Sequence, residues 1–234
     1  MKIVKEFSRF ADEYNKHNII QSEVAKRLTS MLDKSKYSKV LDLGSGAGAV
    51  YENFLKQGII VDEFTAFDFS KEMLSLHPNA KNIKKKHADF NEINSFFMYK
   101  KNEFNILISA SALQWSSDLS KVLASISPLA SEYYFAFFTS NTFATLHDTA
   151  GIKSPIYSKK CIISSLKEHY NIETEIKDYK LYFDSVYEML KYIKRSGVSG
   201  GSRQLSYEKI KSLIKNYPLD YLEFEVLFIK AYRN

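Results

Sequence analysis

The sequence lacks several features that would place the protein outside a reducing compartment. Among its 234 residues there is one cysteine, Cys161, so no internal disulfide can form, and we expect a cytoplasmic location. No apolar run approaches the length of a membrane span, and no signal peptide is recognisable. The five histidines are scattered, without the spacing of a metal site. A disulfide scaffold, a membrane span and a metal centre are therefore not expected.

Apolar residues and lysine are plentiful instead. Hydrophobic residues make up 45% of the chain, enough for one core, and the length predicts a single α/β domain over residues 1–234. The net charge is +6, with lysines grouped at 84–86, 100–101, 159–160 and 191–195. A basic surface favours an acidic partner, either nucleic acid or an acidic protein, although lysines also serve as a solvated surface.

The most informative stretch runs from Lys39 to Gly48. It predicts a short buried strand over residues 40–43, a glycine-rich turn and the start of a helix carrying Val50, Phe54 and Leu55 on one face. Glycines let the backbone turn tightly and approach a ligand, and the first N–H groups of a helix are free to donate. This combination predicts a nucleotide-binding site.

The acid before the turn indicates which nucleotide is bound. Gly44, Gly46 and Ala49 satisfy the dinucleotide pattern only weakly. Asp42 places a carboxylate beside the turn, where it would repel a pyrophosphate but suit a ligand with an ammonium and a sulfonium. The Asp-x-Gly-x-Gly-x-Gly pattern resembles motif I of the class I S-adenosylmethionine (SAM) methyltransferases.

Acids also follow the next two predicted strands. Asp68 lies about 20 residues past the glycines, where a carboxylate can accept hydrogen bonds from both ribose hydroxyls. Asp89 and Phe90 resemble the class I motif in which an acid accepts from the adenine amino group and the next side chain packs on the ring. Ser109 ends the fourth strand and opens into Ser111–Trp115, at the sheet edge where open α/β folds bind ligands.

Strands and helices alternate along the chain, which predicts a Rossmann-like α/β fold. We expect a mostly parallel seven-stranded sheet with an antiparallel edge strand, helices on both faces, and an N-terminal helical segment that acts as a lid. The expected strands are 39–43, 63–68, 83–87, 104–109, 133–139, 172–183 and 219–232. The expected helices are 4–32 (long or broken), 49–56, one capped by Ser70, 118–128, one from 143 through 147, 159–170, 185–195 and 206–215, with a flexible loop at 197–203.

Taken together, the chain resembles the malonyl-[acyl-carrier protein] O-methyltransferases of biotin synthesis. The residues that carry this resemblance are Phe7-Ser8-Arg9, Ala11, Tyr14, Gln21, Ser109, Leu113-Gln114-Trp115, Phe138-Thr139, Leu146-His147, Phe183-Asp184, the stretch 189–197 and the closing strand 222–233. The chain departs from the family in being somewhat short, in having Ile193 where leucine is usual, and in the loop 198–202. These departures concern substrate contacts rather than the class of reaction.

The resemblance implies SAM-dependent methylation of the free carboxylate of a malonyl thioester, with an acidic acyl-carrier protein as partner and a monomeric enzyme. A carboxylate is already a nucleophile, so no residue is predicted to transfer a proton. The residues expected to bind the cofactor are Tyr14, Asp42, Gly44, Ser45, Gly46, Gly48, Asp68, Phe69, Asp89, Phe90 and Ser109. The candidate substrate contacts are Tyr14, Trp115, Lys194 and Arg195. We expect neither a membrane nor a nucleic acid partner.

Three other functions stay open at this point. Another class I methyltransferase could act on a small metabolite or on tRNA, although the loop at 111–115 lacks the Asn-Pro-Pro-Tyr type of motif used for base amines. The glycine pattern also permits a dinucleotide oxidoreductase. A regulator that binds SAM without catalysis would show the same motifs.

Overall fold

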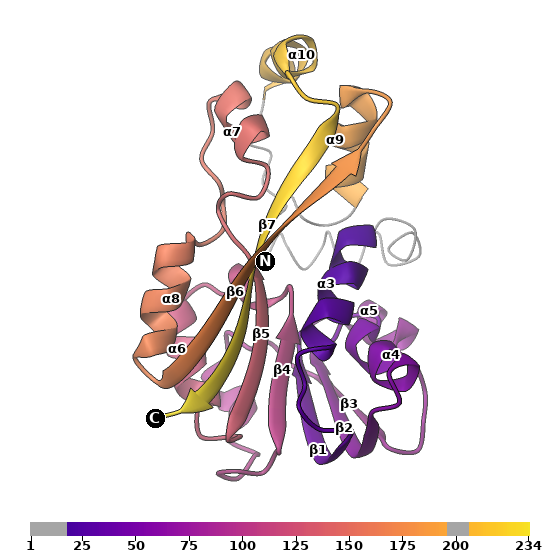
Figure 1. Cartoon of the computed structure of the whole chain (residues 1–234), viewed down its shortest axis with the longest axis vertical. Coiled ribbons are helices and arrows are strands. Elements are labelled where there is room, and N and C mark those ends of the chain that lie inside the picture. Colours follow the sequence, from indigo (N-terminus) through magenta and orange to yellow (C-terminus); the bar gives the residue numbers. More distant parts are fainter. Residues whose placement is uncertain (1–17, 196–205) are drawn as a thin grey trace.

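The structure, a computed structural model, describes residues 18–195 and 206–234. Seven strands form one sheet in the order β3-β2-β1-β4-β5-β7-β6 (Figure 1). The strands are β1 (Lys36–Leu43), β2 (Ile60–Asp68), β3 (Ile83–His87), β4 (Ile106–Ala110), β5 (Glu132–Phe138), β6 (Tyr170–Tyr182) and β7 (Tyr221–Arg233). The helices are α3 (Ile19–Thr29), α4 (Ala49–Lys56), α5 (Lys71–Leu76), α6 (Leu119–Ile126), α7 (Ala144–Ala150), α8 (Lys159–Lys167), α9 (Val186–Arg195) and α10 (Tyr207–Asn216), with short 3-10 turns η1 (Ile93–Phe96) and η2 (Leu113–Trp115).

The strand pairing confirms the predicted, mostly parallel sheet. β1 to β5 pair in parallel, whereas β7 is antiparallel to both of its neighbours. The reversed strand is therefore second from the edge, and β6 is the edge strand. β6 and β7 form a long ribbon of 13 residues each, which continues past the rest of the sheet towards α9 and α10 (Figure 1).

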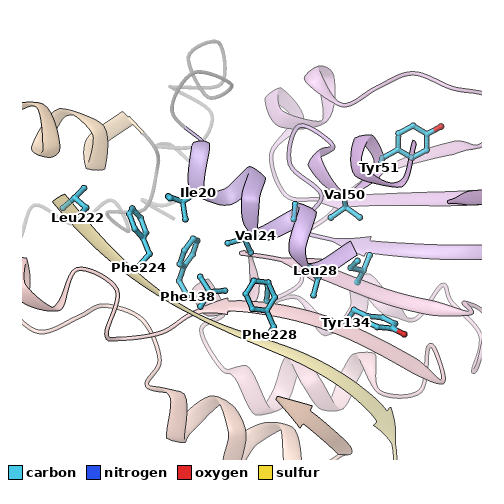
Figure 2. Packing of buried hydrophobic residues seen from close by; sticks show 14 of the residues in the cluster. Ile20, Val24, Leu28, Val50, Tyr51, Tyr134, Phe138, Leu222, Phe224 and Phe228 are labelled. Atoms are coloured by element: carbon cyan, nitrogen blue, oxygen red, sulfur yellow. The ribbon is translucent and has the colours of Figure 1, made fainter. Parts of the chain in front are cut away.

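Helices cover the two faces of the sheet, as expected for a fold whose central strands are buried on both sides. On one face α3 and α4 pack on the sheet, and Figure 2 shows Ile20, Val24 and Leu28 of α3 beside aromatic residues of β5 and β7. On the other face α6 and α8 contribute apolar side chains to a second buried cluster, namely Leu119, Val122, Leu123, Ile126, Ile162 and Leu166.

The predicted apolar face of the helix at 49–56 needs one correction. Val50 and Phe54 are buried, but Leu55 is 61% exposed. Successive helical residues are turned by about 100° from one another at 3.6 residues per turn. Leu55 therefore falls on the outer face when Phe54 points into the core.

Helix starts follow the predicted bounds more closely than helix ends do. The hydroxyl of Ser70 accepts from the Met73 N–H at 3.2 Å, and the Asp118 carboxylate accepts from the Lys121 N–H at 3.0 Å. The helix expected over 159–170 ends earlier, at Lys167, because Tyr170 already belongs to β6. Strand pairing with β7 supplies the backbone bonds of Tyr170 in place of helix bonds.

The predicted N-terminal helix is described only in its last part. α3 confirms it over Ile19–Thr29, where Arg27 also donates to Glu175 of β6. Residues 4–17, with Tyr14, and the predicted loop at 197–203 lie outside the described residues. Within 18–195 and 206–234, no helix combines the length and apolarity that crossing a membrane requires.

Candidate active site

A cavity of about 330 Å³ opens at the carboxyl ends of β1, β2 and β4, where α3 and α4 meet the sheet. Its volume falls within the usual range for small-molecule sites. Seven of the predicted site residues line it, namely Gly44, Ser45, Gly46, Asp68, Phe69, Phe90 and Trp115. The other lining residues are Asn18, Gln21, Ser22, Ala25, Ala47, Ala49, Val50, Glu52, Met73, Ala110, Ser111 and Ala112.

The glycine turn is hydrogen-bonded to β2 and packs closely against the loop after β4. The N–H groups of Gly44 and Ser45 both donate to the Phe67 carbonyl, at 2.8 and 3.0 Å. Gly44 has φ +78°, and a Cβ added to it would lie 2.2 Å from the Cβ of Ala112. A side chain at Gly44 would therefore push the two walls of the cavity apart.

Gly46 leaves room for a ligand. Its φ is +54°, and the nearest atom to an added Cβ is the methyl carbon of Met73, at 3.5 Å. Its N–H donates to Asp68 Oδ2 at 2.8 Å, so the turn and the end of β2 hold each other in place.

Asp68 is held at the end of β2, beside the glycine turn, and its contact with a ribose stays a prediction. Asp68 is buried, and its other oxygen, Oδ1, accepts from the Ser70 N–H at 2.8 Å. Burial raises its pKa, while the backbone N–H groups of Ser70, Gly46 and Phe69 lower it. A carboxylate has about four acceptor sites, so Asp68 keeps capacity to accept from a ligand hydroxyl.

Asp42 is fully buried behind the turn, and neither of its oxygens has a hydrogen-bond partner. Burial, together with the nearby Asp68 charge, raises the pKa of Asp42 well above its usual range. A positively charged ligand near these two carboxyl groups would favour their ionised forms. This agrees with a cofactor that carries an ammonium and a sulfonium.

Unpartnered polar atoms are concentrated at the end of β1 and in the two loops that meet at the cavity. Six buried side-chain atoms of these segments have no hydrogen-bond partner among the described residues. The six are both oxygens of Asp42, the hydroxyls of Ser45, Ser111 and Ser116, and Oε1 of Gln114. Buried polar groups usually find partners, so this concentration fits a ligand site and the residues fit SAM.

Four predicted cofactor residues, Asp42 among them, lie beside the cavity rather than in its wall. Gly48 is needed for packing, because a Cβ on it would lie 2.5 Å from Cδ of Pro78. Asp89 Oδ1 accepts from the backbone N–H of Asn91 at 2.8 Å, and the Ser109 hydroxyl donates to the Leu43 carbonyl at 2.6 Å. Their direct contact with a cofactor stays a prediction, while their structural contacts are clear.

The candidate substrate contacts are separated. Trp115 lines the cavity, whereas Lys194 is exposed on α9 and is not in the cavity wall. Arg195 ends α9, but its side chain lies outside the described part of the chain, as does Tyr14. The structure therefore brings only Trp115 to the site described here.

Sequence reasoning missed most of the wall formed by α3. Asn18, Ser22 and Ala25 line the cavity at spacings of four and three residues, which places them on one helix face. The spacing could have been noticed in the sequence, next to the apolar face of the same helix. Small and polar residues at such positions, however, belong to no recognised motif. Glu52 and Met73 were missed because they belong to no motif, whereas the segment from Ser111 to Trp115 was predicted to lie at the ligand-binding edge.

The fold and the site define a class. A mostly parallel sheet of this order, with a glycine turn after β1 and an acid at the end of β2, is the Rossmann-like fold of the class I methyltransferases. Residues 41–131 match the family model of the methyltransferase domain, Methyltransf_11. This match indicates a methyltransferase that uses SAM. The YcgJ protein of Bacillus subtilis has the same fold, with a TM-score of 0.65, 14% identity and coverage of 91% of this chain and 98% of that one.

Four curated relatives share one name, malonyl-[acyl-carrier protein] O-methyltransferase. The relative from Bacillus cytotoxicus is 28% identical over 151 residues, which cover 61% of this chain and 52% of that protein. The match thus spans about half the length of that relative. The relative from Chlorobium phaeovibrioides is 26% identical, over 93% of this chain and 87% of that protein. The chain resembles this family, as its motifs predicted.

Proposed function

We propose that the protein methylates the free carboxylate of a malonyl thioester carried by an acyl-carrier protein, with SAM as methyl donor. The observation that carries the proposal is the similarity to relatives of that name, two of which match over 93% of this chain. The resulting methyl ester would prime the synthesis of the biotin precursor. Masking the charge in this way would let the acyl chain enter apolar elongation sites, since burying a charge costs several kcal/mol.

The described residues have defined tasks in this proposal. Asp68 accepts from the ribose hydroxyls, and Asp42, behind the turn, favours the positive end of the cofactor when its carboxyl group is ionised. Gly46 keeps the space beside the turn open, while Phe90 and Met73 supply apolar walls. When bound, SAM supplies a methyl group on a sulfonium, which is an electrophile with a good leaving group.

Catalysis then rests on alignment and on the exclusion of water. The acceptor carboxylate needs no general base, so the site can function without a proton-transfer residue. Holding two reactants in line can lower a barrier by roughly 7 kcal/mol or more. The walls formed by α3, the glycine turn and the loop with Trp115 enclose the space where this alignment would occur.

The carrier protein would approach over the surface formed by α9. Lys191 and Lys194 of α9 are at the surface, next to Arg195 in sequence, and the chain has an overall charge of +6. An acidic carrier protein is attracted to such a surface over the range of the Debye length. We propose that α9 guides the carrier, whereas Trp115 contacts the delivered acyl group.

The decisive test is mass spectrometry of malonyl-carrier protein after incubation with the enzyme and SAM. We expect a gain in mass of one methyl group. The Gly46→Val variant serves as the inactive control. A wild-type enzyme that leaves malonyl-carrier protein unchanged, yet methylates tRNA or a free metabolite, would overturn the proposal in favour of another class I methyltransferase.

A further inference from the structure

The backbone at Ser111 is unusual and lies in the wall of the candidate active site. Ser111 has φ +60°, in the left-handed region that favours glycine. Only Asn102, Ser111 and Phe143 share positive φ among the described non-glycine residues, and Asn is well tolerated there. The glycine turn across the cavity uses glycine for the same backbone conformation. Strained backbone conformations cluster at functional sites, so we expect the serine side chain to have a functional role here.

Two hydrogen bonds hold Ser111 in this conformation. Its N–H donates to the carbonyl of Ala136 on β5 at 2.9 Å, and its own carbonyl accepts from Gln114 Nε2 at 2.7 Å. Gln114 is buried, with 3% of its surface exposed, so this bond is shielded from water. The position of Ser111 is therefore fixed by its surroundings, while its own hydroxyl is buried without a partner.

The charges around the cavity favour a neutral donor at this point. The described wall contains two carboxylates, Glu52 and Asp68, and no lysine or arginine. An acceptor carboxylate that enters this wall can be oriented there by neutral N–H and O–H groups. Such donors hold the acceptor without a tight ion pair, which would stabilise the ground state of the attacking oxygen and not raise turnover.

We infer that Ser111 is a specificity-determining residue whose hydroxyl donates to the acceptor carboxylate, and that Gln114 is a positioning residue that holds Ser111 in place. The inference rests on the proposed function and names the group that recognises its substrate. Removing a hydrogen bond to a charged group should lower kcat/KM about tenfold or more. The affinity for S-adenosylhomocysteine should stay within about twofold of wild type, because the hydroxyl serves the acceptor and not the cofactor.

The test compares Ser111→Gly and Ser111→Ala in the malonyl-carrier methylation assay, with S-adenosylhomocysteine affinity measured by calorimetry. Glycine removes the hydroxyl and also the backbone strain, whereas alanine removes the hydroxyl alone. Both variants should lose activity, and Ser111→Gly should keep or gain thermal stability. Asn102→Gly is the matched control, since it relieves a similar φ of +56° away from the cavity and should keep full activity.

Gln114→Met tests the positioning role. It should lower kcat/KM in the wild-type background but add little to the loss in Ser111→Gly, because residues that act through one another are not additive. Full activity of Ser111→Gly beside an active wild type would overturn the inference alone. A parallel loss of S-adenosylhomocysteine affinity would assign the hydroxyl to the cofactor and also overturn it. An inactive wild type would overturn the proposed function and this inference with it.

Discussion

The molecule has two regions that are built differently. The cofactor half contains β1 to β4 and the glycine turn, and the ribbon half contains β6, β7 and α9. β1 is buried along its last four residues and ends directly in the glycine turn. β6, by contrast, is mostly exposed along its 13 residues and lies at the edge of the sheet. The first half concentrates its binding groups within short segments, around residues 42–48 and Asp68. The second half places charged and aromatic residues on long elements that diverge from the sheet (Figure 1). The proposed function thus assigns cofactor binding to short local segments and partner recognition to charges distributed over long elements.

The largest expected effect comes from the glycine turn. Gly46→Val should abolish SAM binding, with a loss of more than about 100-fold, because a branched side chain would fill the space that a ligand needs and resist φ +54°. Calorimetry with SAM measures the loss, and circular dichroism should show a folded protein. The control is Gly58→Val, which has φ +70° and nothing within 4 Å of an added Cβ. Gly58→Val should keep its SAM affinity. Normal SAM binding by Gly46→Val would instead show that the glycine turn only reverses the chain and does not contact the cofactor.

Asp68→Ala should have the next largest effect. Loss of its charge-assisted hydrogen bonds should weaken SAM binding by about 1.5–3 kcal/mol. The matched control is Asp62→Ala on the same strand, whose carboxylate is exposed and pairs with Lys36 at 3.8 Å. Titration of both variants with SAM should separate them clearly. Equal affinities would remove Asp68 from the ribose site.

Much of the cofactor half could be predicted from the sequence because its signals are short. The strand before Gly44, the cap at Ser70 and the acid at Asp68 are read from neighbouring residues, and the structure places each as expected. The parallel order of the sheet follows from the alternation of strands and helices. The antiparallel pairing at the sheet edge is also confirmed, whereas Leu55 was assigned to the wrong helix face.

The rest of the site could not be predicted, since it depends on contacts between distant segments. Ser22 and Ala25 reach the cavity only because α3 packs across α4 and the sheet. The conformation of Ser111 depends on Ala136, 25 residues further along the chain, as well as on Gln114. Neither the sequence spacing nor the residue types indicate those bonds. Gly48 and Ser109 were predicted to be site residues because they match a motif. They lie near the cavity but do not line it.

Asp42 provides a pH test of the cofactor half. Its carboxyl group has a folded-state pKa raised well above the usual range by burial and by Asp68. In the free protein its charge therefore costs stability as pH rises above the unfolded pKa, and that cost is absent below it. A cationic cofactor favours the ionised form, so SAM affinity should increase as pH rises through the folded pKa.

The variant that tests this is Asp42→Asn. It should raise the melting temperature of the free protein at neutral pH and lower SAM affinity by several-fold. It should also flatten the dependence of affinity on pH, measured by calorimetry at a series of pH values over which both proteins stay folded. An unchanged pH profile would show that Asp42 does not sense the charge of the cofactor.

The smallest expected effect concerns the ribbon half, where binding energy is spread over exposed charges. Lys191 pairs with Glu188 at 2.9 Å and lies over the Tyr187 ring, and Lys194 is exposed on the same helix. The double variant Lys191→Glu/Lys194→Glu should raise the KM for malonyl-carrier protein a few-fold and leave SAM affinity unchanged. The difference should shrink as salt rises, because exposed charges are screened over about 8 Å at physiological ionic strength. The control is Lys160→Glu/Lys167→Glu on α8, which makes the same change in net charge on a helix far from α9 (Figure 1). If both double variants raised KM equally, the carrier would sense only the overall charge of the molecule, and α9 would lose its proposed role in docking.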